Sequence, residues 1–346
     1  MGSVALSQGR VSGKLLLVDE DTVRIVASVR PPSIEWAVIS VAVTLVVVFA
    51  VSAFVIGFDT LMSSLRKFDS VTIGFFLLLL GWQVGCRFLR WFLYARCLGL
   101  KISPQEAFLY YAAAFGMTLT PGRLGEALRL WFLEKRLAVP YRRTAGLYVA
   151  DRVSDAAAYL ILLAAGVATY QHGTRIAWGS VLVVAAVIAP IMDPRPITGL
   201  LNASYALVRR GRKLVVWLRR AVLNTSTLFQ PRVFLPGVAI GTIGWIAAPA
   251  VLTASLSKMG VDFNLFHAMV IYAAAALAGG ATMMPGGGGA TETVLVILLT
   301  GSDVPLDAAV SAMIMTRLIF LWLPVGLGTL LLPVAMKMVR TAGKLS

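Results

Sequence analysis

Cysteine, histidine and acidic residues are scarce in this chain of 346 residues. It has two cysteines and two histidines, and its 16 aspartates and glutamates are outnumbered by 31 lysines and arginines. Cys86 and Cys97 lie in or beside one apolar segment, which argues against a structural disulfide. Because the cysteines and histidines are few and scattered, we expect no metal site built from them and no cofactor.

Charged residues of either sign are also few. They make up 14% of the chain, whereas hydrophobic residues make up 58% and the mean hydropathy is +0.83. A soluble domain is hard to reconcile with these values. Residues 36–57 form 22 positions without a charge, long enough to cross a hydrocarbon core of about 30 Å. The 35 residues before them are fairly polar, so we expect a polytopic membrane protein without a signal peptide.

Apolar stretches run over 36–57, 71–95, 107–133, 144–170, 176–192, 233–256, 266–299 and 305–336. Two of them are interrupted, one by Pro121 and Gly122 and the other by Pro285 and the four glycines after it. Each half is about 13 to 19 residues, which is short for a full crossing. Non-helical backbone is tolerated at membrane depth where it is buried in protein or lines a wet cavity. We therefore predict two re-entrant pairs of half-helices and about six full spans.

An internal repeat relates the two interrupted stretches. A shift of 161 residues aligns the run YAAA at Tyr111 with the same run at Tyr272, and slightly larger shifts align later prolines and arginines. The aligned pairs, in chain order, are Gly99 with Gly260, Ala107 with Ala268, Pro121 with Pro285, Pro140 with Pro305 and Arg152 with Arg317. The common order and the nearly constant offset favour a true repeat over chance.

The two repeat units are expected to lie in opposite orientations. If each interrupted stretch returns to its own side, an odd number of crossings separates the units, so the second is inserted upside down. The lysines and arginines agree, since 21 lie on one proposed side and four on the other. The basic side is cytoplasmic by the positive-inside rule, which places both termini inside. Inverted repeats with discontinuous helices are typical of transporters whose site lies near the midplane.

The predicted fold is an all-α integral membrane protein with an inverted-topology repeat. Its segments are a cytoplasmic N-terminal tail (1–35), an extra first span (36–57), a first repeat (70–170) with a re-entrant segment at 105–136, a linking span with a basic amphipathic cytoplasmic helix (171–231), and a second, inverted repeat (232–338) with a re-entrant segment at 264–300. The basic helix, within 206–223, alternates basic and apolar residues and suits an anionic lipid surface. The net charge of +15 therefore indicates a membrane rather than a nucleic acid.

Four stretches of sequence resemble a known family. They are TPGRLGE from Thr120, DRVSD from Asp151, PGGGGATE from Pro285 and MTRLIFLWLP ending at Pro324. Over about 70–335 the chain resembles the flippase-like transmembrane region of lysylphosphatidylglycerol synthases and their stand-alone relatives. The resemblance implies a lipid-handling protein of the bacterial cytoplasmic (inner) membrane. It does not imply synthesis, since the synthases carry a large soluble aminoacyl-transfer domain and ten residues follow Met336.

Most lysines and arginines are assigned to one of the two faces of the membrane. Six arginines are left within the apolar stretches: Arg87, Arg90, Arg123, Arg129, Arg152 and Arg317. A charge at the centre of a span costs about 2.5 to 3.5 kcal/mol and usually faces a cavity or a partner. Arg317 and Glu292 are each isolated from other charges in their own stretches. We therefore predict that they pair with each other and, by the repeat, that Arg152 pairs with Glu126.

These buried charges have two interpretations. In the first they are structural ion pairs that brace the half-helices. In the second they form a binding site, because arginines outnumber the acids and a bidentate guanidinium suits phosphate. Half-helix N-termini at the two interruptions also suit an anion, and their glycines allow close approach of a ligand or a second backbone. Arg123, whose one nearby acid is Glu126, is the first candidate for a phosphate contact.

Asp151 and Asp155 are four residues apart and share a helix face, with Arg152 beside it. Paired carboxylates can bind a cation, relay protons or act as a general base. The alternative is that Arg142, Arg143 or Arg152 holds them in a cytoplasmic vestibule.

The predicted function is that of a transporter or flippase that moves an anionic or polyprenyl-type lipid between leaflets through a central cavity lined by buried arginines. The main alternative is a membrane-embedded transferase acting on a lipid phosphate or a lipid-linked sugar, with Asp151, Asp155 or Glu126 as base. Another is a partner that presents lipid to a lipid-modifying enzyme. The expected substrate-binding residues, none of them catalytic, are Arg87, Arg90, Pro121, Gly122, Arg123, Gly125, Glu126, Asp151, Arg152, Asp155, Pro285, Gly286, Gly287, Glu292 and Arg317.

Overall fold

The structure is a computed structural model that describes residues 59, 62–63, 66–120, 125–169, 227–282 and 284–342. These residues form helices and turns with no strand among them, which confirms the predicted helical class. The predicted N-terminal tail (1–35), first span (36–57), linking span (176–192) and basic helix (206–223) lie outside the described residues.

In the first half, two short helices lie between two long ones. The elements are α4 (Ser70–Cys97), α5 (Pro104–Ala113), the 3₁₀ turn η1 (Ala114–Met117), α6 (Leu128–Leu137) and α7 (Tyr141–Val167). Asp69 starts α4 by accepting a hydrogen bond of 2.9 Å from the backbone N–H of Thr72. Hydrogen bonds from the Thr72 side chain and backbone hold the pKa of the Asp69 carboxyl below its ordinary value, so the cap stays charged. Ser103 caps α5 in the same way, with Pro104 in the first turn.

The second half has more breaks in its helices. Its elements are α11 (Pro231–Trp245), α12 (Ala247–Lys258), α13 (Leu265–Ala281), the 3₁₀ turn η3 (Pro285–Gly287), α14 (Ala290–Thr300), α15 (Leu306–Arg317), the π turn η4 (Leu318–Trp322) and α16 (Leu323–Ala342). Pro249 has no N–H to donate to the carbonyl of Trp245, which accounts for the break between α11 and α12.

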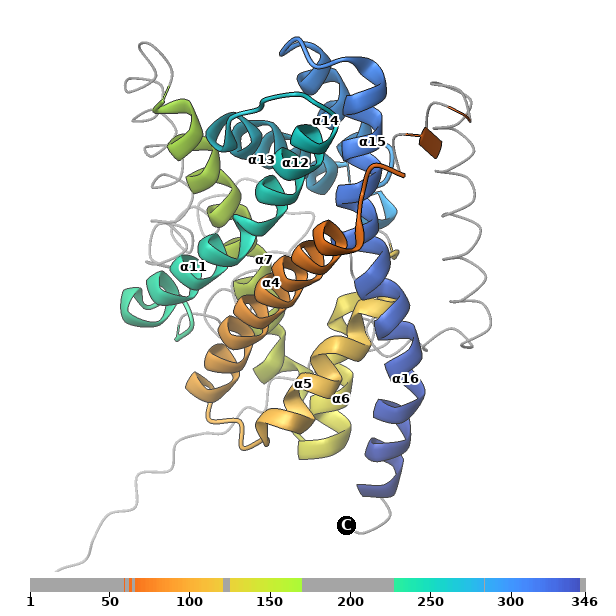
Figure 1. Cartoon of the computed structure of the whole chain (residues 1–346). Helices are drawn as coiled ribbons and strands as arrows, with labels where there is room; N and C mark the ends of the chain where they lie inside the picture. Colours follow the sequence, from red (N-terminus) through yellow and green to blue (C-terminus); the bar gives the residue numbers. More distant parts are fainter. Residues whose placement is uncertain are drawn as a thin grey trace, which may run out of the picture.

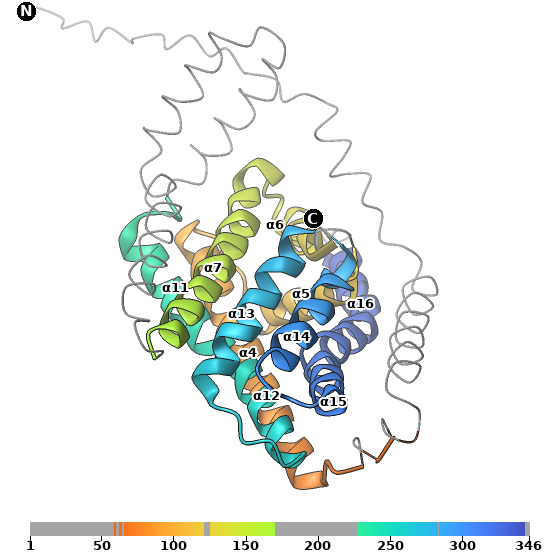
Figure 2. The ribbon, with the colours of Figure 1, turned by 90° about the horizontal axis from the view of Figure 1, so that it is seen from above.

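The two halves have the same order of elements. In each, a glycine in the left-handed region follows a long helix, with φ of 72° at Gly99 and 83° at Gly260. A helix, a turn and a short helix come next, and the following helix is capped by Pro140 in the first half and by Pro305 in the second. Figure 1 shows α5 and α6 near the C-terminal end of α4, and α13 and α14 near the opposite end of the molecule. Seen from above, α7, α13 and α14 lie side by side between α11 and α16 (Figure 2).

Three helical stretches among the described residues are long and apolar enough to cross a membrane: Ser70–Cys97, Pro231–Lys258 and Leu306–Val339. α7 has 27 residues, enough to cross, but it carries charges in its middle. α5 and α6 have ten residues each, about 15 Å of helix and half of a hydrocarbon core. Large apolar side chains such as Val71, Leu78 and Leu330 face outwards. The chain is therefore a multi-pass membrane protein.

The first interruption begins earlier than the sequence indicates. The sequence places it at Pro121 and Gly122, but α5 already ends at Ala113 and η1 follows. The reason is the contact of η1 with α16, where a Cβ on Gly116 would lie 2.8 Å from the backbone nitrogen of Thr329. Backbone packed this closely on another helix leaves no room for a side chain. The second interruption falls at η3, where it was predicted.

Candidate functional site

A buried group of charged side chains lies where α4, α6 and α7 meet. We call it the charged cluster, and its members are Arg87, Arg90, Glu126, Arg129, Asp151, Arg152 and Asp155. All except Arg152 are at most 5% exposed. The spacings of three residues on α4 and four on α7 place their charges on facing sides of the two helices. Charges buried to this degree require partners, and most of these have several.

Arg90 joins α4 to α7. Its Nη2 lies 2.5 Å from Oδ1 of Asp151 and 2.7 Å from Oδ1 of Asp155, and its Nε donates to Asp151 at 3.1 Å. The indole N–H of Trp245 in α11 also donates to Asp155, at 2.8 Å. Two carboxylates therefore tie three helices together.

Arg129 and Arg152 link Glu126 to Asp151. Nη2 of Arg129 lies 2.7 Å from Glu126 Oε2, and its Nη1 lies 3.3 Å from Asp151 Oδ2. Nη2 of Arg152 lies 3.2 Å from Glu126 and 2.8 Å from Asp151. The pairing of Arg152 with Glu126 that the repeat predicts is thus present. Thr118 adds a hydroxyl hydrogen bond of 3.3 Å to Glu126.

Arg87 is the least satisfied member of the charged cluster. Its Nη2 lies 3.6 Å from Asp155 and 3.9 Å from Glu126, beyond hydrogen-bond distance. Its Nε and Nη2 have no hydrogen-bond partner among the described residues. The rings of Phe115 and Trp245 lie 5.6 Å and 5.0 Å from its guanidinium carbon. Four arginines face three carboxylates in the cluster, and the geometry leaves the unmatched charge at Arg87.

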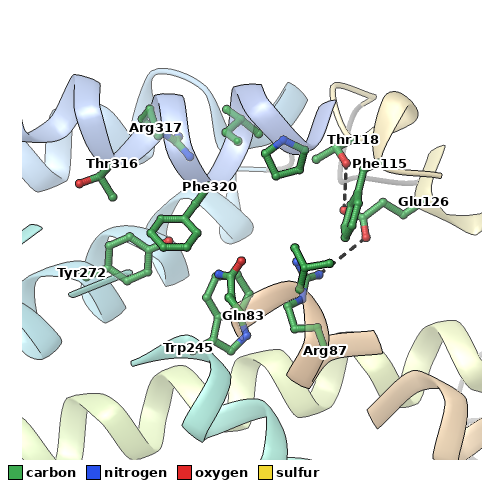
Figure 3. Close-up of a pocket in the computed structure, with 13 residues that line it drawn as sticks. Gln83, Arg87, Phe115, Thr118, Glu126, Trp245, Tyr272, Thr316, Arg317 and Phe320 are labelled. Atoms are coloured by element: carbon green, nitrogen blue, oxygen red, sulfur yellow. Dashed lines mark hydrogen bonds and ion pairs between the residues drawn. The ribbon is translucent and has the colours of Figure 1, made fainter. Parts of the chain in front are cut away.

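Arg87 lines a cavity between the two halves of the chain (Figure 3). Its wall consists of Gln83, Val84, Arg87, Phe115, Thr118, Glu126, Trp245, Tyr272, Thr316, Arg317, Phe320, Leu321 and Pro324. The cavity volume is about 30 Å³, room for about two water molecules. This space would have to widen to hold a lipid headgroup.

Arg317 lies on the wall that the second half supplies. Its Nε donates a hydrogen bond of 2.8 Å to Oε1 of Glu292, and its Nη2 donates to the carbonyl of Gly287 at 3.3 Å. The Glu292–Arg317 pair predicted from the sequence is therefore present. Gly286 and Gly287 have φ of 61° and 69°, a conformation that favours glycine and that turns the loop carbonyl towards the arginine.

The other predicted loop residues have different outcomes. Pro121, Gly122 and Arg123 lie outside the described residues, so the role of Arg123 stays a prediction. At Gly125 a Cβ would collide with the backbone carbonyl of Met117, which explains the glycine there by close packing.

The paired aspartates of α7 belong to the ion-pair network. Asp151 and Asp155 are contacted by Arg90 and Arg152, whereas Arg143 donates at 2.8 Å to the carbonyl of Leu98. In the described part of the chain, no group of three Cys, His, Asp or Glu side chains is placed to hold a metal ion. The geometry favours ion pairing over a metal or acid–base site.

Sequence reasoning missed several residues of the cavity and the cluster. Arg129 was recognised as buried but not as part of the site. Gln83 lies one turn before Arg87 on α4, and this spacing could have identified it. Trp245 lies in an apolar stretch, where nothing in the sequence sets it apart from ordinary core residues. Tyr272 was recognised as the start of the repeated YAAA run but not as part of a site.

No curated protein matches the chain. The family described as the lysylphosphatidylglycerol synthase TM region matches residues 37–328, which is well over half of the sequence. This range includes every described residue of the cavity and the charged cluster. The family is associated with lipid synthesis or flipping in a membrane. The chain therefore belongs to the lysylphosphatidylglycerol synthase TM-region family.

Proposed function

We propose that the protein is a flippase that moves an anionic or polyprenyl-type lipid between the leaflets of the bacterial cytoplasmic membrane. The observation that carries this proposal is the guanidinium of Arg87 on the cavity wall, whose Nε and Nη2 have no hydrogen-bond partner among the described residues. A guanidinium with free N–H groups fits the oxygens of a phosphate. Lipid phosphates are the anions that a bilayer presents to such a cavity.

An inverted arrangement of the two halves supports transport. In this proposal α5 and α6 enter from the cytoplasm, α13 and α14 enter from outside, and both termini are cytoplasmic. The shared order of elements and the position of the two pairs at opposite ends of the molecule agree with it. The cavity has walls from both halves, as expected for a site between two repeats that rock about it.

Widening of the cavity for a lipid headgroup requires a helix that can change shape, and we assign this role to the π turn η4. It directly follows Arg317 and contributes Phe320 and Leu321 to the cavity wall. Pro324 follows in the same wall and has no N–H to hold the helix there. π turns inside helices often occur at functional sites.

A membrane-embedded transferase is the second candidate, because the family description refers to a synthase. Such an enzyme needs a proton acceptor at the cavity. Glu126 is the carboxylate on the described wall, and it already accepts hydrogen bonds from Arg129, Arg152 and Thr118. This engagement favours transport over proton transfer.

The test is reconstitution of the purified protein in liposomes that contain fluorescent phosphatidylglycerol. We expect faster exchange of the label between leaflets than in protein-free liposomes, with no change in the mass of the lipid. Mass spectrometry of the extracted lipids supplies the second readout. A new lipid species formed by the purified protein alone would assign the cavity to the transferase.

A further inference from the structure

We propose that Gln83 is a specificity-determining residue of the cavity. Its carboxamide and the guanidinium of Arg87 together bind one lipid phosphate, and the pair favours a singly charged phosphodiester over a phosphomonoester. This inference rests on the proposed function and adds the residue that distinguishes one headgroup from another.

The side chain of Gln83 is buried at the cavity. It lies one turn before Arg87 on α4, lines the same cavity and is 2% exposed (Figure 3). Its side-chain nitrogen has no hydrogen-bond partner in the part of the chain that the structure describes. An unmade hydrogen bond in a low-dielectric site costs free energy, and at Gln83, which faces the cavity, a bound ligand can recover that cost.

Gln83 and Arg87 offer different donors to the same space. Both have buried nitrogen atoms without hydrogen-bond partners among the described residues, and the rings of Phe115 and Trp245 lie 5.6 Å and 5.0 Å from the guanidinium carbon of Arg87. Arg317, on the opposite wall, is already bound to Glu292. The first half of the chain therefore supplies the phosphate donors.

The balance of charge indicates which phosphate fits. Among the described residues of the charged cluster and the Glu292–Arg317 pair, five guanidiniums face four carboxylates. One negative charge from a phosphodiester matches this surplus, whereas a phosphomonoester carries about 1.5 to 2 negative charges at neutral pH. Gln83 adds a donor without adding charge. A monoester would leave negative charge uncompensated in a buried space.

The experiment measures binding of short-chain lipids to the full-length protein in detergent, from the rise in Tm with lipid concentration. The probes are dioctanoyl phosphatidylglycerol (a diester), dioctanoyl phosphatidic acid (a monoester) and dioctanoylglycerol (no phosphate). We expect the wild type to bind the diester most tightly and to ignore dioctanoylglycerol. Gln83→Leu keeps the approximate size, so its Tm without lipid should be unchanged or higher. Its affinity for the diester should fall about tenfold, the effect of one lost hydrogen bond to a charged group.

Ser255→Ala is the matched control. Ser255 lies on α12, is fully buried, has a hydroxyl without a partner among the described residues and is not part of the described cavity wall. Its replacement should leave binding of all three probes unchanged. Gln83→Lys adds a second positive charge and should shift the preference towards the monoester.

If Gln83→Leu binds the diester as tightly as the wild type does, the inference about Gln83 is wrong and the flippase proposal is unaffected. If the wild type does not exchange lipid between leaflets, the flippase proposal itself is wrong. If Gln83→Leu does not fold, Gln83→Asn takes its place, because its side chain is shorter by one methylene group and its amide lies farther from the phosphate. This variant should bind the diester more weakly, and unchanged binding would contradict the inference. Equal binding of diester and monoester by the wild type would remove the claimed preference. A Tm rise with inorganic phosphate as large as that with the lipid would refute a lipid source of the phosphate.

Discussion

Arg317 donates a hydrogen bond of 2.8 Å to Glu292, and Arg152 contacts Glu126 at 3.2 Å in the corresponding place of the first half. In both halves the arginine follows the proline that caps its helix by 12 residues. The first pair has become part of the charged cluster, whereas the second stays a pair. The unmatched positive charge therefore belongs to the first half.

Variants of the Glu292–Arg317 pair should distinguish its contribution to folding from its contribution to transport. Arg317→Ala leaves the carboxylate of Glu292 mostly buried and unpaired, so we expect a loss of about 3 kcal/mol in stability and a clear drop in Tm. Arg317→Ala combined with Glu292→Ala removes both charges and should recover most of that Tm. Lipid exchange should remain impaired in the double variant, because the wall that the second half supplies has lost Arg317 while Arg87 remains.

The double variant decides the role of this pair. Normal lipid exchange by Arg317→Ala with Glu292→Ala would mean that these two charges only brace the helices. Thermal unfolding in detergent and exchange in liposomes are the two measurements required.

Arg87 and Arg90 should respond in opposite ways to the same substitution. Arg87→Gln leaves three arginines for three carboxylates, so the protein should fold with a small change in Tm. Its lipid exchange should fall about tenfold or more, since a charge-assisted contact to phosphate is lost. Arg90→Gln removes hydrogen bonds to both Asp151 and Asp155 and should lower stability by about 3 to 5 kcal/mol. Lipid exchange at the wild-type rate by Arg87→Gln would contradict an anion-binding role for Arg87.

Two glycines of α16 offer a test of the close contact with η1. A Cβ at Gly328 would collide with the backbone nitrogen of Gly116, whereas a Cβ at Gly326 meets nothing within 4 Å. Gly328→Ala should lower stability by about 1 to 3 kcal/mol through overpacking. Gly326→Ala is the control and should leave Tm unchanged or raise it, since alanine is the better helix former. Equal Tm values for the two variants would show that α16 moves away from η1 without cost.

Cysteine labelling tests the orientation of the two halves. In a background that lacks Cys86 and Cys97, cysteines at the exposed positions Ser70 and Ser302 should react with an impermeant reagent from outside intact cells. Cysteine at the exposed Lys101 should react only after the membrane is made permeable. Mass tagging on gels reads out both reactions. Labelling of position 101 in intact cells would refute the inverted arrangement.

Much of the second half could be predicted from its sequence. α13 is capped at Asn264 and α14 ends at Thr300, so these helix ends coincide with the bounds of segment 264–300, whereas its re-entrant course stays a prediction. An asparagine at the start of α13 and Gly301 after α14 are residue types that mark helix ends in a sequence. Glu292 and Arg317 could be paired because neither has another charge nearby in its own apolar stretch.

The first half was harder to predict, because its charges are many and their partners depend on how helices cross. Arg90 lies 61 residues from Asp151, its strongest partner, and no local spacing connects them. The early end of α5 follows from contact with α16, far along the chain. The spacing of Gln83 to Arg87 is a local signal, but the cavity that both residues face is formed by helices from both halves of the chain.

The charged cluster has a consequence for the way the chain enters the membrane. During synthesis α4 is complete before α7 exists, so Arg87 and Arg90 reach the insertion machinery without the acids that later surround them. Each such arginine costs about 2.5 to 3.5 kcal/mol at the centre of a span. The apolar remainder of α4 must offset that cost alone until about 60 further residues have been made. We therefore expect that the ion pairs with α7 stabilise α4 in the membrane only after α7 has arrived beside it.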